Sequence, residues 1–362
     1  MLKKNKKILS VITATLVMVI GISFTNVQAA SIKRMNGKNR IDTANKTAKE
    51  IFQKSEAVIL VNGTGYADAV SSAPLSKLLN APILLTENKG TLESDVLKTI
   101  NDLQNVKKIY IVGGTGVVST TMENSLKSKG FQVIRYDGQK YGDKTRYGTN
   151  ARVAEEILKL SPKSKTGILV NGQDGYADAL SVASVAATNG YPVLFGNTKN
   201  VPNVIKNNII SKNKLQILAV GGNGVLPSSV VSSVNGKKIT SDVQSKNRFQ
   251  TNLAVLEYFK GKGGLDFSNV YIAAGGQGGK AGQGQFADAL VASAAAAKTG
   301  SPLVLSGLGA GTTEIANVEK FVETNIEDEG NLVIVGGSAS VSDSIEKKLY
   351  EKVGDFTIVD VS

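Results

Sequence analysis

The sequence predicts an α/β protein built from three consecutive units of similar structure. Internal repetition is the first observation: NGTGYADAVSSAPLSKLLNAPILLT at 62–86 returns as NGQDGYADALSVASVAATNGYPVLFG and as GQFADALVASAAAAKTGSPLVLS. Two markers that keep one period indicate duplicated units. The second observation is the alternation of β-branched runs with helices of about 12 residues, which is typical of parallel strands covered on both faces. The markers recur at intervals of 110 residues: Asp68, Asp178 and Asp288, and Pro82, Pro192 and Pro302.

The elements of the first unit follow a regular order. A helix is expected over 42–54, then the buried strand AVILVNG, a helix over 67–79 and the strand PILLT. A helix over 91–104, the strand KIYIVGG, a helix over 119–129 and the strand FQVIRYDG complete the unit. Right-handed crossovers would arrange each unit as a Rossmann-like or flavodoxin-like layer of about four parallel strands. The predicted units are 31–138, 139–241 and 242–362.

The first 30 residues have the composition of a secretory signal. Four lysines precede the apolar run ILSVITATLVMVIGISF, and Val27 and Ala29 match the pattern of a signal peptidase site. We expect 1–30 to be a signal peptide cleaved after Ala29, with an uncleaved membrane anchor as the alternative. No second apolar run of about 18 residues follows, so the mature chain is expected to be secreted and free of the membrane.

Composition excludes several classes of enzyme. The chain has no cysteine and no histidine, so it cannot form a Ser-His-Asp or Cys-His nucleophile or the usual histidine-containing zinc site. Carboxylate pairs of the glycosidase type remain, but Asp68, Asp178 and Asp288 supply one acid per unit, and no second acid recurs beside all three. We therefore expect a protein that is not an enzyme, and we predict no metal ligands.

The glycine-rich loops do not match nucleotide-binding motifs. A dinucleotide fingerprint needs G-x-G-x-x-G/A, and Gly63 and Gly65 are followed by Asp68 where the last small residue is required. The other loops fail in spacing, and none carries the G-K-[ST] of a phosphate-binding loop. We predict no cofactor, and we interpret the glycines as tight strand-to-helix turns that need positive φ.

Three kinds of polar residue recur at equivalent points. An arginine opens the segments NRIDTANKTA, TRYGTNARVA and NRFQTNLAV, an asparagine ends the first strand of units one and two, and the ADA acid begins the next helix. Each arginine is interpreted either as a fork that ties its helix to the aspartate of its own unit or as a ligand for an anionic group. The candidate site residues are Arg40, Asn62, Asp68, Arg146, Asn171, Asp178, Arg248 and Asp288.

The ADA segments suggest two further structural roles. An acid in the first turn of a helix can accept free backbone N–H groups and interacts favourably with the helix dipole. The aromatic residue before each motif could stack on a sugar, but we expect it to pack as a cover on the helix. These aromatic residues are Tyr66, Tyr176 and Phe286.

Taken together, the arginine segments, the NG..GYADA and PILLT motifs and the three copies of IVGG resemble the cell wall binding repeat type 2 family. The resemblance covers essentially the whole mature chain. It implies three repeats packed side by side around a pseudo-threefold axis within a monomer. It also implies non-covalent anchoring to Gram-positive cell walls by binding an anionic secondary wall polysaccharide. Members usually carry a separate effector region, and we recognise none here.

Charge is distributed unequally over the units. The net charge of +12 becomes +8 without the four signal lysines, and the three units carry +5, +8 and −5. We expect the anionic polymer to contact units one and two more than unit three, which has the insertion GGQGGKAGQGQ and lacks the asparagine. No nucleic acid partner is expected. Two alternatives stay open: a wall hydrolase that uses carboxylates, and a self-assembling surface-layer component.

Overall fold

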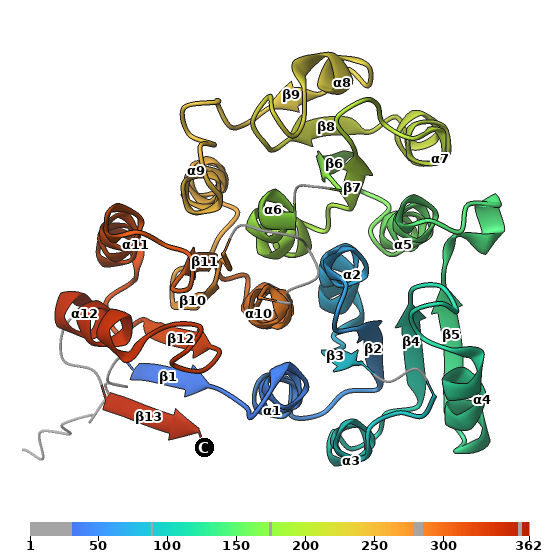
Figure 1. Cartoon of the computed structure of the whole chain (residues 1–362), viewed down its shortest axis with the longest axis horizontal. Coiled ribbons are helices and arrows are strands. Elements are labelled where there is room, and N and C mark those ends of the chain that lie inside the picture. The colour runs from blue at the N-terminus through green and yellow to red at the C-terminus, as the bar shows by residue number, and fades with distance from the viewer. Residues whose placement is uncertain (1–30, 88–89, 174–175, 278–284, 354–356, 362) are drawn as a thin grey trace, which may run out of the picture.

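Three parallel β-sheets make up the protein, and helices separate them (Figure 1). The computed structural model describes residues 31–361 except 88–89, 174–175, 278–284 and 354–356. The predicted signal peptide, 1–30, lies outside the described residues. Within the described part of the chain, no helix is both long and apolar enough to cross a membrane.

The first sheet has the strand order β3-β2-β4-β5, which is the flavodoxin-like arrangement. Its strands are β2 (Ala57–Asn62), β3 (Ile83–Thr86), β4 (Lys108–Val112) and β5 (Gln132–Tyr136). All neighbouring strands are parallel. The eight elements predicted for this unit are present, with ends within three residues of the expected positions. The predicted α/β fold class is therefore confirmed.

The second sheet repeats the same order as β7-β6-β8-β9. Its strands are β6 (Thr166–Asn171), β7 (Val193–Gly196), β8 (Gln216–Ala219) and the short β9 (Lys237–Lys238). Continuous burial along β6 and β7 explains their apolar sequences, because helices cover both faces of the sheet.

The third sheet is completed by the beginning of the chain. Its order is β11-β10-β12-β1-β13, so β1 pairs in parallel with β12 on one side and with β13 on the other. In this sheet β1 takes the place that β5 and β9 occupy in the others. The strands are β10 (Asn269–Ala274), β11 (Leu303–Ser306), β12 (Asn331–Val335), β1 (Ser31–Met35) and β13 (Thr357–Val361).

The helices that open each unit begin at a polar cap. The side chains of Asn39, Thr145 and Asn247 accept a hydrogen bond from the first turn of α1, α5 and α9, respectively, which satisfies N–H groups that a helix start leaves free. The NR and TR motifs are therefore capping residues followed by the first helical residue.

The helices are α1 (Arg40–Phe52), α2 (Tyr66–Leu79), α3 (Ser94–Asp102), α4 (Thr120–Ser128), η1 (Gly138–Tyr141), α5 (Arg146–Leu160), α6 (Tyr176–Asn189), α7 (Asn203–Ile205), η2 (Lys206–Ser211), α8 (Ser228–Ser232), α9 (Arg248–Lys260), α10 (Ala287–Thr299), α11 (Thr312–Asn325) and α12 (Asp343–Val353).

The helices of the ADA motifs meet at the centre of the molecule. Figure 1 looks along α2, α6 and α10, which pack against one another in all three pairings. Small residues allow this approach: Ala73, Ala183, Ala187 and Ala297 form a cluster of fully buried side chains between the helices. The arrangement has the pseudo-threefold symmetry that the family resemblance implied.

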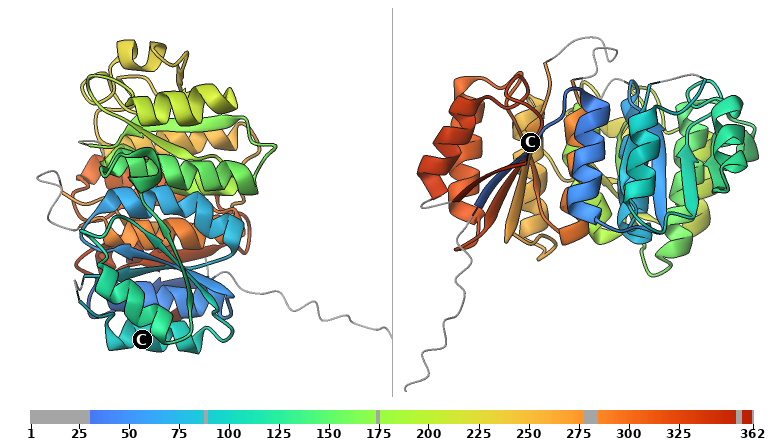
Figure 2. Two further views of the ribbon diagram at one scale, coloured as in Figure 1. Left: turned by 90° about the vertical axis from the view of Figure 1, so that its right-hand side faces the viewer. Right: turned by 90° about the horizontal axis from the view of Figure 1, so that it is seen from below.

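One cluster of buried hydrophobic residues spans all three sheets, and a second cluster lies within unit two. A single cluster of buried residues includes Ile59 of the first sheet, Ile168 of the second and Ile272 of the third, together with Ile32 of β1. The views from the side show strands and helices running in roughly the same direction, so the connecting loops gather on two opposite faces (Figure 2). The ends of the strands that precede the ADA helices lie on one of these faces.

Candidate functional site

Each ADA aspartate lies where the strand order of its sheet reverses, which is where open α/β sheets bind ligands. Asp68 is in the first turn of α2, and its carboxylate packs on Gly113, directly after β4. A Cβ atom on Gly113 would lie 2.8 Å from Asp68 Oδ2, and the φ angle of Gly113 is +126°, so the position requires glycine. The same pairing, with φ of +129° and +117°, joins Gly221 to Asp178 and Gly336 to Asp288.

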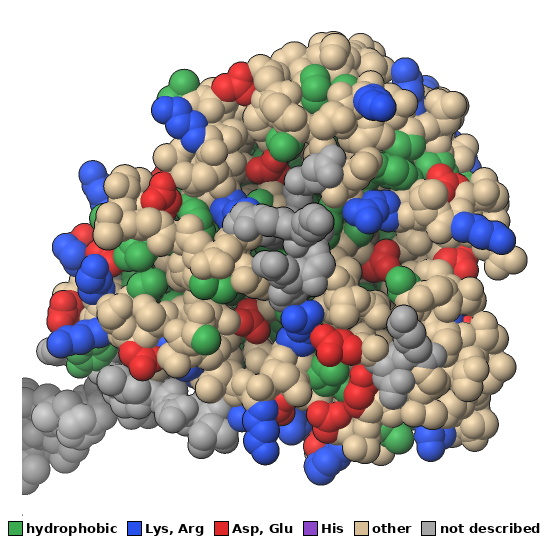
Figure 3. Space-filling model, in the orientation of Figure 1, with side chains coloured by type: hydrophobic (Ala, Val, Ile, Leu, Met, Phe, Trp, Pro, Cys, Tyr) green, Lys and Arg blue, Asp and Glu red, His purple; other side chains and the backbone are tan. Residues whose placement is uncertain are grey.

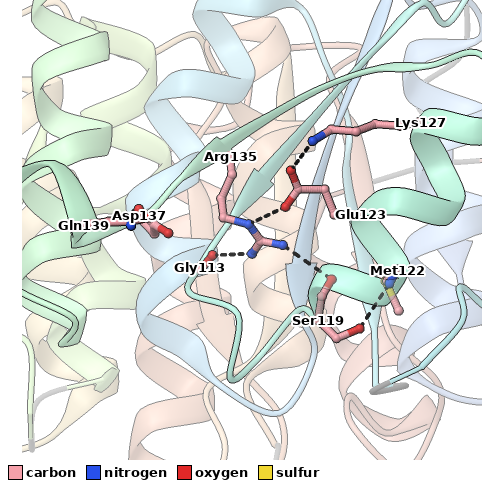
Figure 4. A network of polar contacts seen from close by, with 8 residues as sticks. All are labelled: Gly113, Ser119, Met122, Glu123, Lys127, Arg135, Asp137 and Gln139. Carbon is pink, nitrogen blue, oxygen red and sulfur yellow. Dashed lines mark hydrogen bonds and ion pairs between the residues drawn. The ribbon is translucent and has the colours of Figure 1, made fainter.

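The glycine loop of the first sheet is fixed by an arginine of the neighbouring strand β5 (Figure 4). Arg135 donates from Nη1 to the Gly113 carbonyl at 2.8 Å and from Nε to Glu123 Oε2 at 2.8 Å. Arg34 on β1 makes the corresponding bond to the Gly336 carbonyl at 3.0 Å. In the first and third sheets, therefore, an arginine of the neighbouring strand holds the glycine loop against which the aspartate packs.

Every aspartate faces the arginine of the following unit rather than that of its own. Arg146 acts electrostatically on Asp68, Arg248 on Asp178, and Arg40 on Asp288. The last of these pairs closes a ring, because it joins the third unit to the first. We call these three places the first, second and third boundary, in the order Asp68 with Arg146, Asp178 with Arg248, and Asp288 with Arg40.

Burial disfavours the charged form of all three carboxyl groups. It raises the pKa of Asp68 to about 6, and the neighbouring Arg146 only partly opposes this effect. Burial also raises the pKa of Asp178 to about 6, against hydrogen bonding from Thr251 and the charge of Arg248. The pKa of Asp288 is raised by burial and lowered in part by Ser340. Because partly or fully buried acids of this kind disfavour folding at neutral pH, the three aspartates are candidates for a functional role.

The predicted tie between each unit's first helix and the loop after its first strand is present, but its acceptor is a backbone carbonyl. Arg40 donates from Nη1 to Gly63 O at 2.9 Å, and Arg146 to Gly172 O at 2.7 Å. Arg248 donates to Gly275 O at 2.8 Å. The fork to an aspartate of the same unit was the wrong pairing, because the nearest ADA carboxylate to each arginine comes from the preceding unit.

The two predicted asparagines connect neighbouring strand ends. Asn62 donates from Nδ2 to Val117 O at 3.2 Å and accepts from the Thr64 N–H at 2.9 Å. Asn171 makes the equivalent bonds to Val225 and Gln173. Both side chains are buried. The third unit has Ala274 at the end of β10, so this link is replaced there by an apolar residue.

The aromatic residues cover the central helices, as expected, where their side chains are described. Tyr66 and Phe286 are both buried and pack edge to face with ring centroids 5.9 Å apart. Tyr66 also donates from its hydroxyl to Gly172 O at 2.6 Å, across the first boundary. The side chain of Tyr176 lies outside the described residues.

Sequence reasoning missed a lysine two residues before each arginine. Lys38, Lys144 and Lys246 are exposed, and their ammonium groups have no hydrogen-bond or ion-pair partner among the described residues. The signal was visible as K-N-R, K-T-R and K-N-R at 38–40, 144–146 and 246–248. A threonine three residues after each arginine was also missed: Thr43, Thr149 and Thr251.

Among the described residues, pockets open at the first and third boundaries. At the first, a pocket of about 280 Å³ is lined by Asp68, Lys144 and Arg146, and a second of about 350 Å³ shares Lys144 with it. At the third, a pocket of about 310 Å³ is lined by Lys38 and Arg40 opposite the ADA helix of unit three. Basic and acidic side chains are interspersed over the face seen in Figure 3. A lysine, an arginine and the carboxyl group of an ADA aspartate thus line the 280 Å³ pocket and the 310 Å³ pocket.

The described residues contain no group of three or more acidic, histidine or cysteine side chains placed to hold a metal ion. Each boundary instead combines a lysine, an arginine and one carboxyl group at the ends of two units. This arrangement can bind an anionic group through the cations and a hydroxyl group through the carboxylate.

The comparisons with known proteins identify the family. The model of cell wall binding domain 2 matches residues 34–123, 140–231 and 243–346. The chain is 30% identical over 328 residues to N-acetylmuramoyl-L-alanine amidase LytC of Bacillus subtilis and 26% identical to the amidase enhancer of the same organism. These matches include 91% of this chain in both cases, but only 60% and 41% of the relatives.

Two solved structures have the same fold. Cwp8 from Clostridium difficile superimposes with a TM-score of 0.73 at 28% identity, over 90% of this chain and 52% of Cwp8. Cwp6 from the same organism gives a TM-score of 0.72 at 25% identity, over 90% of this chain and 49% of Cwp6. With three matched copies along most of its length, the chain belongs to the cell wall binding domain 2 family.

Proposed function

We propose that the protein is a secreted monomer that attaches non-covalently to the cell wall by binding an anionic secondary wall polysaccharide at its three boundaries. The observation that carries the proposal is the lysine and arginine pair at each boundary, repeated around one face of the ring. Because Lys38, Lys144 and Lys246 have no acidic partner among the described residues, their charges are available to a ligand.

Repetition compensates for weak individual contacts. An exposed ion pair contributes about 0 to 1 kcal/mol and is screened beyond roughly 10 Å. Three sites on one rigid body can engage successive segments of a repeating polymer, which raises the effective concentration for each later contact and can multiply affinity by about 10²- to 10⁴-fold. The shared hydrophobic core supports such rigidity, since it spans all three sheets.

The experiment compares single and combined substitutions in the full chain. Isolated units are unsuitable, because β1 belongs to the third sheet. Lys38→Gln, Lys144→Gln and Lys246→Gln are each measured for binding to anionic polysaccharide extracted with acid from Gram-positive walls, and the triple variant is measured beside them. We expect the triple variant to lose far more affinity than any single variant.

A matched control tests position rather than total charge. Lys107, Lys129 and Lys165 are exposed and lie outside the boundaries, so the triple glutamine variant at these sites has the same net charge. Binding that falls equally in both triple variants would contradict a boundary site. Retention of full affinity by the boundary triple variant would contradict it as well.

We propose binding rather than catalysis for this region. The similarity to an amidase supports an association with cell walls, but the chain spans only 60% of that protein and has no histidine or cysteine. Incubation of the purified protein with walls, followed by measurement of released sugar and peptide fragments, separates the two functions. Turnover would overturn the proposal.

A further inference from the structure

The first boundary has features that point to a ligand of defined chemistry. Its two pockets share Gly114, Gly116, Lys144 and Thr149 as lining residues. They are therefore parts of one continuous trough along the junction of units one and two. A trough of several hundred Å³ is in the size range of small-ligand sites.

The arginine of this trough makes no ion pair among the described residues, whereas the arginine of the third boundary makes one. Arg146 donates only from Nη1, so its Nε and Nη2 groups have no acceptor among the described residues. Arg40 at the third boundary instead pairs through Nε with Glu87 at 3.2 Å. Unit two also carries the largest positive balance, +8. An anionic group would therefore be attracted most strongly here.

The carboxyl group of Asp68 is also open to a ligand. No side chain or backbone group among the described residues donates a hydrogen bond to it. Asp288 Oδ2 at the third boundary already accepts from Ser340 at 2.8 Å. At the position of Ser340 the first unit has Val117 and the second has Val225, and neither side chain can donate.

The backbone of the trough adds further donors. The N–H groups of Gly114, Thr115 and Gly116 have no acceptor within the described part of the chain, although all three residues line the trough. A simple anion would use these donors and the cations but would be repelled by the Asp68 carboxylate. A sugar that carries both an acidic group and hydroxyl groups satisfies every one of these partners.

We infer that the first boundary is the dominant subsite and that it binds an acidic sugar, with the acidic group against Lys144 and Arg146 and a hydroxyl group donating to Asp68. This inference rests on the proposed function and adds the ligand's chemistry and the ranking of the boundaries. The other boundaries then contribute weaker electrostatic contacts to the same polymer.

Matched substitutions at two boundaries test the ranking. A Cβ atom on Gly116 or on Gly224, its counterpart at the second boundary, would meet no atom within 4 Å, so both positions accept a side chain. We expect Gly116→Glu and Lys144→Gln to weaken binding of the acid-extracted polysaccharide about tenfold or more, and Gly224→Glu and Lys246→Gln to weaken it less than about threefold. Equal losses at the two boundaries would overturn the ranking.

Small probes test the chemistry of the subsite. Glucuronic acid, glucose and inorganic phosphate are titrated into the full chain while the amide NMR signals of Gly114 and Gly116 are followed. We expect glucuronic acid to shift them most. Asp68→Asn should weaken glucuronic acid binding, because it removes the charged acceptor for a sugar hydroxyl group. The same substitution should strengthen phosphate binding, because it removes the repulsion between the carboxylate and the anion. Equal responses to phosphate and glucuronic acid in the unsubstituted protein would overturn the sugar assignment.

The results separate this inference from the function on which it rests. If the unsubstituted protein fails to bind the extracted polysaccharide, the proposed function is wrong. If it binds and the first-boundary variants bind as well as Lys165→Gln, the function stands and the subsite is wrong.

Discussion

The carboxyl group of Asp68 is partly buried without a hydrogen-bond donor among the described residues, and its charged form is disfavoured. A group of this kind lowers stability at neutral pH, since the unfolded chain solvates the same charge fully. Its recurrence at the first turn of α2, α6 and α10 therefore favours a role in binding over a role in folding. Stability and binding should then respond in opposite directions to its replacement.

Asp68→Asn should stabilise the protein at pH 7 and leave it unchanged near pH 3. Burial raises the pKa from 3.8 to about 6, so the native state keeps its proton where the unfolded state loses it. The stability that this proton brings is fully present below pH 3.8 and is lost as the pH rises through about 6. We expect a gain of roughly 1 to 3 kcal/mol at pH 7, measured by urea unfolding.

The exposed Asp328 supplies the control for this measurement. Asp328→Asn should change the free energy of unfolding by less than about 0.5 kcal/mol at either pH. If Asp68→Asn destabilised the protein at pH 7, the carboxylate would be a favourable structural contact, and the argument from burial would be wrong.

Two glycines of the same loop should respond differently to alanine. Gly113→Ala places a Cβ atom against Asp68 at a φ of +126°, and we expect it to lower the free energy of unfolding by about 1 to 3 kcal/mol. Gly116→Ala meets open space and should be nearly neutral. Thermal unfolding of the two variants checks the difference, and equal losses would contradict the proposed packing.

Elements within a unit could be predicted from the sequence, whereas contacts between units could not. The strands and helices of unit one follow from local periodicity, and the N-caps of α1, α5 and α9 follow from single residues. The partner of Arg146 is Asp68 of another unit, and no local pattern indicates which units are neighbours. The boundary lysines could have been found, because K-x-R recurs with the arginines.

Strand β1 was missed because five residues give little periodicity. A copy of its sequence did exist: RMNG at 34–37, at the end of β1, resembles RYDG at 135–138, at the end of β5. The resemblance has a physical reason, since Arg34 and Arg135 both bind the carbonyl of a repeated glycine. Five residues at the start of predicted unit one therefore complete the sheet of unit three.

Ile32→Ala should destabilise the whole protein, although the residue lies near the beginning of the described chain. Ile32 is 1% exposed and belongs to the common core, so we expect a loss of about 2 to 4 kcal/mol in urea unfolding. Val243, which is 71% exposed, provides the control, and Val243→Ala should have little effect. A negligible loss for Ile32→Ala would mean that β1 is not a stable part of the third sheet.

At the scale of the whole molecule, closure of the ring makes the three units interdependent. Each unit's first helix packs against the ADA helix of the preceding unit, as α5 does on α2, α9 on α6 and α1 on α10. Strand β1 joins the first unit to the last. The three boundaries therefore exist only in the assembled ring, so each proposed polymer site is formed by two units.

This interdependence predicts that the three units unfold in one transition. Because one buried cluster spans all three sheets and α2, α6 and α10 meet at Ala73, Ala183, Ala187 and Ala297, loss of one unit would expose apolar surface of both others. Differential scanning calorimetry should give one peak, with a calorimetric enthalpy equal to the van't Hoff enthalpy. Ala183→Leu overpacks the axis and should lower the midpoint of the whole peak, at a loss of about 1 to 3 kcal/mol. Ala339→Leu, at an exposed position away from the axis, is the control. Two or three separate peaks would show that the units fold independently and that the boundaries are secondary contacts between finished domains.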